Sequence, residues 1–109
     1  GGQLSGKYIG GQRPPGARRT LDKRSSRYGN PQAEAATEAY VAHAHAFGLD
    51  PNQMAIAFCT RQLFNTATII GATSMDQLKT NIAAHDLVLS DELLKGIEAI
   101  HKRYPNPGP

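Results

Sequence analysis

The stretch TIIGATSMDQLKTN, residues 68–81, carries the strongest fold signal in this chain. Just before and within it, β-branched residues occupy four of the five positions from Thr66 to Ile70, which predicts a short strand that stops at Gly71. A helix is expected from about Met75 to Ala84, opened by small hydroxyl side chains. Backbone N–H groups at a helix start carry partial positive charge, so a strand, a glycine turn and a helix in this order suit a bound phosphate.

Outside this stretch the signals are mostly helical. Residues 31–47 have helical apolar spacing and end before Gly48, as a helix with a glycine cap should. Asp50-Pro51 predicts the start of a second helix, and Ser90-Asp91-Glu92 predicts the start of the last one. A single strand cannot satisfy its own backbone hydrogen bonds, so this inventory indicates a part of a larger α/β protein.

The first thirty residues differ from the rest in composition and charge. They hold seven of the eleven glycines and almost no apolar periodicity, and they read as a long irregular loop. Against one acid, Asp22, they carry seven basic side chains: Lys7, Arg13, Arg18, Arg19, Lys23, Arg24 and Arg27. The other 79 residues hold five basic and eight acidic side chains, so the formal net charge of +3 belongs to this end. Two interpretations stay open here: a solvated loop, or a loop that binds an anion such as a nucleotide or nucleic acid.

Several function classes lack the residues they would need. Cys59 is the only cysteine, so no intramolecular disulfide is expected and a cytoplasmic location is predicted. His43 and His45 lie two residues apart and face different sides of their helix, so no metal site is predicted. No apolar run approaches the roughly 18–20 residues of a membrane span, and no set of side chains forms a catalytic constellation.

Two motifs together resemble a known family. GQLSGKY at residues 2–8 is followed, after about sixty residues, by IIGAT at residues 69–73 with Gln77, Leu78 and Asn81 behind it. This pair resembles the C-terminal part of an aldo-keto reductase, in the branch of the Tas-like bacterial reductases and the potassium channel β subunits. The resemblance implies an α/β fold: the C-terminal part of a (β/α)8 TIM barrel, mostly helical, with one clear barrel strand. Residues 1–30 would be a cofactor-covering loop, and residues 31–109 the last barrel helices, the eighth strand and the C-terminal helix.

The resemblance also implies a cofactor, NADP(H), and its binding residues. Gly2, Ser5 and Lys7 would lie along the pyrophosphate and the adjoining ribose. Arg18 would lie near the adenosine phosphate, Gly71 and Thr73 would face the 2′-phosphate, and Gln77 and Asn81 would reach that phosphate and the adenine edge. Two positions depart from the family pattern: Thr80 stands where glutamate is usual, and Gln77 replaces more basic residues, which leaves less positive charge at the phosphate.

The function implied is an oxidoreductase that reduces aldehydes or ketones by hydride transfer from the nicotinamide. The family's catalytic Asp, Tyr, Lys and His have no match here, so no catalytic residue is predicted and the chain alone is expected to be inactive. The partner implied is a small carbonyl substrate, without nucleic acid or membrane, and a homo-oligomer stays open. The alternative is a non-enzymatic nucleotide- or protein-binding module derived from the same fold.

Overall fold

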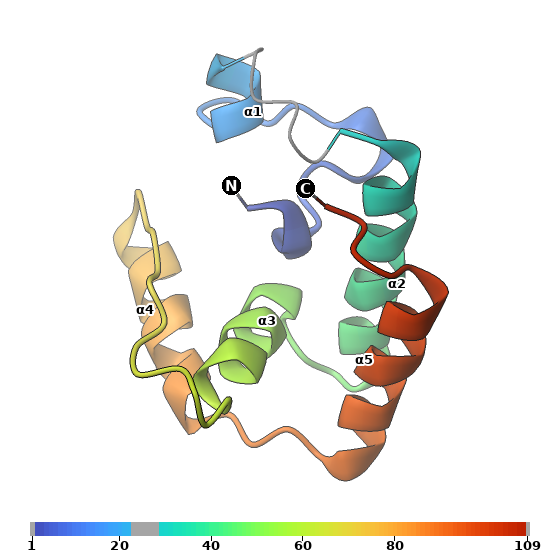
Figure 1. Cartoon of the computed structure of the whole chain (residues 1–109). Coiled ribbons are helices and arrows are strands. Elements are labelled where there is room, and N and C mark those ends of the chain that lie inside the picture. Colours follow the sequence, from blue (N-terminus) through green and yellow to red (C-terminus); the bar gives the residue numbers. More distant parts are fainter. Residues whose placement is uncertain (1, 23–28, 109) are drawn as a thin grey trace.

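The computed structural model describes residues 2–22 and 29–108, and every regular element within them is a helix. The α-helices are α1 (Arg18–Leu21), α2 (Pro31–Ala46), α3 (Pro51–Thr60), α4 (Met75–Ala83) and α5 (Asp91–Arg103). Short 3-10 turns are η1 (Gln3–Ser5), η2 (Ile9–Gly11) and η3 (Ala84–Asp86). Figure 1 shows α2 and α5 side by side, with α3 between this pair and α4.

The four longer helices begin at side-chain caps. Asn30 accepts a hydrogen bond from the backbone N–H of Ala33 at 2.8 Å, and Asp50 accepts one from Gln53 at 2.9 Å. In both helices proline follows the cap, where its missing N–H costs nothing. Ser74 and Ser90 cap α4 and α5 in the same way. The helix starts predicted at Asp50-Pro51 and at Ser90 are confirmed, as is the end of α2 before Gly48, whose φ is 69°.

One apolar cluster joins α2, α3 and α5. Its six buried side chains are Ala44, Met54, Ala57, Leu89, Leu93 and Ile97. Partly buried apolar side chains pack around them: Tyr40, Leu49, Phe58, Leu87 and Leu94. Leu93 is 1% exposed, and a fully buried leucine side chain stabilises a fold by about 1.5–3 kcal/mol. This cluster therefore fixes α3 against the α2–α5 pair.

The predicted barrel strand is wrong for this chain. Residues 66–70 form neither strand nor helix, and Ile69 is 97% exposed. A parallel strand in a sheet needs a neighbour to accept and donate its backbone hydrogen bonds, and no second strand lies within the described residues. β-branched residues favour the strand conformation, but this preference forms a strand only where a neighbouring strand is present. The α/β fold class is corrected accordingly to an all-helical arrangement of the described residues.

The long loop expected over residues 1–30 is partly ordered into turns. It holds η1, η2 and the single-turn helix α1, while Lys23, Arg24 and Arg27 lie outside the described residues. Among the helices that are described, none is both long enough and apolar enough to cross a membrane.

His43 of α2 lies directly against Gly96 of α5. The imidazole Nε2 of His43 is 2.9 Å from the backbone carbonyl of Leu93, to which it donates. A Cβ atom added to Gly96 would overlap the His43 ring, with the ring Nδ1 only 3.0 Å away. Glycine is therefore required in the middle of α5, where it otherwise weakens a helix.

We predict that Gly96→Ala destabilises the chain, although alanine is the better helix former. The overlap with His43 should lower the free energy of unfolding by about 1–3 kcal/mol, measured by urea denaturation followed by circular dichroism. In a His43→Ala background the overlap is absent, and the same change should instead stabilise by up to about 1 kcal/mol. A stabilising Gly96→Ala in the unaltered chain would contradict the packing described for α2 and α5.

Candidate cofactor site

The turn at η1 brings together three of the residues predicted to bind the cofactor. The Ser5 hydroxyl donates to the backbone carbonyl of Gly2 at 2.7 Å. Gly2 has a φ of 77°, and a Cβ there would lie 2.7 Å from the Lys7 ammonium nitrogen, so the lysine folds directly over the glycine. Because Gly2 has no side chain, the end of the Lys7 side chain can occupy the space above it. A hydroxyl and an ammonium group meet on one small turn, which is the donor chemistry that a phosphate requires.

Tyr8 connects this turn to α1. Its side chain is only 6% exposed, and two cations lie against its ring: the Lys7 ammonium at 5.3 Å and the Arg19 guanidinium at 5.1 Å from the centroid. The backbone N–H of Arg19 donates to the Tyr8 hydroxyl at 3.3 Å. Arg18, the arginine predicted to bind the cofactor, is exposed on α1 next to Arg19. The tyrosine therefore places α1, with Arg18, beside the Gly2–Lys7 turn.

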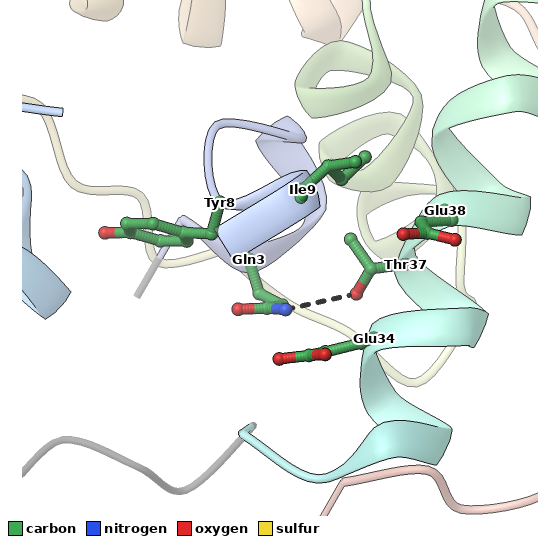
Figure 2. A pocket seen from close by; sticks show the side chains of 7 residues that line it. Gln3, Tyr8, Ile9, Glu34, Thr37 and Glu38 are labelled. Atoms are coloured by element: carbon green, nitrogen blue, oxygen red, sulfur yellow. Dashed lines mark hydrogen bonds between the residues drawn. The ribbon is translucent and has the colours of Figure 1, made fainter. Parts of the chain in front are cut away.

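Gln3 links the same turn to α2. Its amide donates to the Thr37 hydroxyl at 3.4 Å, and its carbonyl oxygen accepts from the Arg19 guanidinium at 2.9 Å. Figure 2 shows this contact, with Glu34 near it and Tyr8 pointing away to the other side of the turn. The hollow on this side holds about 20 Å³, room for roughly one water molecule, and Glu34 lines it. Its size and the carboxylate exclude it as a dinucleotide site.

A second hollow, of about 190 Å³, opens beside the apolar cluster. Leu4, Tyr40, Met54 and Phe58 are among the side chains that line it. Partial burial, and then the negative charge of Glu98, raise the pKa of the Tyr40 phenol, which keeps it neutral. A pyrophosphate would lose its hydration in this apolar hollow and would find no cationic side chain to pair with. The phosphates are therefore not expected here.

The start of α4 collects the other predicted residues. Gln77 accepts at its side-chain oxygen from the Thr73 backbone N–H at 2.9 Å and from the Thr73 hydroxyl at 3.1 Å. Ser74 caps the helix, and Gly71 is exposed with nothing within 4 Å of a Cβ built on it. The turn is exposed, but Gln77 already engages both donors of Thr73, and no donor of residues 71–77 is charged. Its one charged residue in the first turn is Asp76, which opposes an anion.

Asn81 is held inside the chain. It is 6% exposed, donates to the Gly71 carbonyl at 3.1 Å and accepts from the Asn52 amide at 2.6 Å. Beside it, the Gln53 amide donates to the Thr80 carbonyl at 3.0 Å. In this structure Asn81 therefore ties the turn at Gly71 to α3.

The two groups of predicted residues lie on different sides of α3. Both η1 and α4 contact α3, but within the described ranges η1 and α4 make no contact with each other. The donor set fits the cofactor unequally, because the N-terminal group carries the cations and the α4 group carries neutral donors beside Asp76. Among the described residues no three His, Cys, Asp or Glu side chains are arranged to hold a metal ion.

Comparison with known proteins decides the family. The model of the aldo/keto reductase family matches residues 1–102. The chain belongs to the aldo/keto reductase family. It is 52% identical over 108 residues to the protein Tas of Escherichia coli K12, and equally to that of Shigella flexneri. These alignments cover 99% of the chain and 31% of each relative, so the chain spans about a third of the length of these curated relatives.

Family membership confirms the resemblance found in the two motifs and makes this a chain of an oxidoreductase family that uses nicotinamide dinucleotides. Four supporting residues were missed by sequence reasoning: Gln3, Tyr8, Arg19 and Asn52. Gln3 and Tyr8 stand inside the GQLSGKY motif, which was the available signal. Arg19 and Asn52 act through contacts 16 and 29 residues distant, which no local pattern indicates.

We predict that Asn81→Ala destabilises the aldo/keto reductase chain by about 1–3 kcal/mol, because it leaves the half-buried Asn52 amide without an acceptor and the Gly71 carbonyl without a donor. Thermal unfolding followed by circular dichroism measures the loss. The control is Lys79→Ala on the same helix, which is exposed and should change stability by less than about 0.5 kcal/mol. Equal effects of the two substitutions would contradict the bridging role of Asn81.

Proposed function

We propose that this chain is the cofactor-binding C-terminal part of an NADP(H)-dependent aldo/keto reductase that reduces small aldehydes and ketones. The observation that carries the proposal is the turn in which Lys7 folds over Gly2 beside the Ser5 hydroxyl. Family membership supports the reaction class, and the free thiol of Cys59 is in keeping with a reducing compartment such as the cytoplasm.

In this proposal the two groups of site residues bind different parts of the dinucleotide. Lys7, which lies over Gly2, binds a pyrophosphate oxygen, and the Ser5 hydroxyl donates to another once it turns away from the Gly2 carbonyl. Arg18 supplies the positive charge for the adenosine 2′-phosphate. The turn at Gly71 and the amide of Gln77 contribute neutral donors to the same phosphate.

The bound cofactor supplies the hydride, and the chain's own residues bind and orient it. Carbonyl reduction also needs a proton donor held at the carbonyl oxygen. The sequence contains no residue that matches the family's catalytic tyrosine, so the 109-residue chain by itself should bind cofactor without reducing a carbonyl.

The proposal assigns Lys7 and Arg18 to different phosphates, and this difference is measurable. Lys7→Ala should weaken the binding of NADP+ and of NAD+ alike, because both contain the pyrophosphate. Arg18→Ala should weaken the binding of NADP+ alone, because NAD+ lacks the 2′-phosphate. A charge-assisted hydrogen bond contributes about 1.5–3 kcal/mol, so each loss should be about 10- to 100-fold in Kd by isothermal titration calorimetry.

The matched control is Lys102→Ala, which removes an exposed cation that pairs with Glu98 on α5 and should leave both affinities unchanged. Equal loss of NADP+ affinity in all three variants would mean that only net charge matters. Oxidation of NADPH by the unaltered chain in the presence of an aldehyde would contradict the prediction that it is inactive alone.

A further inference from the structure

Asn52 and Asn81 form a chain of two hydrogen bonds whose direction is fixed. The Asn81 amide nitrogen donates to the Gly71 carbonyl at 3.1 Å, and the Asn81 amide oxygen accepts from the Asn52 amide at 2.6 Å. A carbonyl oxygen can only accept, so Asn81 must turn its nitrogen towards Gly71 and its oxygen towards Asn52. Asn52 is therefore the donor that keeps the Asn81 amide in this orientation.

Burial makes this orientation costly to change. Asn81 is 6% exposed, and Asn52 is half-buried in the first turn of α3. A buried polar group that loses its partner is destabilised by the full cost of its desolvation. Without the donor at Asn52, the Asn81 amide gains by rotating or by moving towards water, and either movement releases the Gly71 carbonyl. Asn52 thus acts on Gly71 through Asn81.

The next residue of α3 makes a second tie to α4 that leads elsewhere. The Gln53 amide donates to the Thr80 carbonyl at 3.0 Å. Thr80 lies inside α4, whereas Gly71 precedes Ser74, the residue that caps this helix. Both ties hold α3 against α4, but only the tie from Asn52 reaches the turn in front of α4.

The turn that begins at Gly71 is the part of the chain that meets the adenosine 2′-phosphate in the proposed function. Residues 71–75 carry no charge, so this turn can bind a phosphate only through neutral donors. The strength of a hydrogen bond falls steeply as its distance and angle leave their preferred range, whereas the attraction of a charge falls slowly with distance. Affinity at this turn should therefore depend closely on where the turn is held.

We propose that Asn52 is a positioning residue for the cofactor, which sets the affinity for the 2′-phosphate through Asn81 and Gly71 without touching the dinucleotide. This inference rests on the proposed function, in which the turn at Gly71 binds that phosphate. Because NAD+ lacks the 2′-phosphate, Asn52 contributes to a preference for NADP+ over NAD+. Asn52 lies outside both family motifs, at residues 2–8 and 69–81, so the motifs give no indication of this role.

The test compares Asn52→Ala with Gln53→Ala, which removes the other tie between the same two helices. Asn52→Ala should weaken NADP+ binding about 2- to 10-fold in Kd, the usual net effect of one hydrogen bond, and should leave NAD+ binding nearly unchanged. Gln53→Ala should leave both Kd values nearly unchanged. Isothermal titration calorimetry measures these values, and equal losses of NADP+ affinity in the two variants would overturn the proposal.

A double substitution tests whether the effect passes through Asn81. In an Asn81→Ala background, Asn52→Ala should cause no further loss of NADP+ affinity, because the two residues act in series. Losses that simply add would mean that Asn52 acts by another route, and would overturn the proposal.

A measurement without cofactor follows the turn itself. In the 15N-labelled Asn52→Ala chain, the backbone amide resonances of residues 71–73 should shift, while those of residues 2–8 stay in place. Circular dichroism should show the same helix content as in the unaltered chain. Unshifted resonances of residues 71–73 would contradict the positioning of the turn by Asn52.

The unaltered chain separates this inference from the proposed function. If it binds NADP+ and Asn52→Ala binds NADP+ equally well, the positioning role is wrong and the proposed function stands. If the unaltered chain binds no NADP+, the proposed function is wrong and the positioning role falls with it.

Discussion

The packing of α2 against α5, at the point where His43 meets Gly96, is the contact on which the rest of the structure depends. It allows Ala44 of α2 and Leu93 of α5 to be almost completely buried in one apolar cluster. Met54 and Ala57 of α3 complete that cluster. A helix of ten residues is marginal alone, so α3 takes its stability from this packing.

Helix α3 in turn positions both halves of the candidate site. On one side it contacts η1, which holds Gly2, Ser5 and Lys7. On the other side, Asn52 and Gln53 bind the α4 region through hydrogen bonds to Asn81 and Thr80. The two halves have no contact of their own within the described residues, so their separation is set by α3. A ligand that binds both must be extended, as a dinucleotide is.

The helices could be predicted from the sequence because their signals are local. The caps Asp50, Ser74 and Ser90 act on backbone groups three residues away, and Gly48 ends α2 within the next turn. The strand could not be predicted correctly, because a strand exists only through hydrogen bonds to another strand. That Ile69 is almost fully exposed became visible only in the structure.

The candidate site likewise has a part that follows from local sequence and a part that depends on distant contacts. The grouping of Gly2, Ser5 and Lys7 follows from a seven-residue motif, and the structure brings these residues together. The motif predicts that Asn81 binds the cofactor, and what the structure shows is its hydrogen bond to Asn52, 29 residues away. Tyr8 supports α1 through a cation–π contact with Arg19, and no sequence periodicity indicates a contact of this kind.

The central claim is that one extended cofactor occupies both sides of α3. Its most direct test is a titration of the 15N-labelled chain with NADP+, followed by the backbone amide resonances. The account predicts that residues 2–8 and residues 71–77 shift together, with one common dissociation constant. Shifts confined to one of these two groups, or none in either, would contradict it.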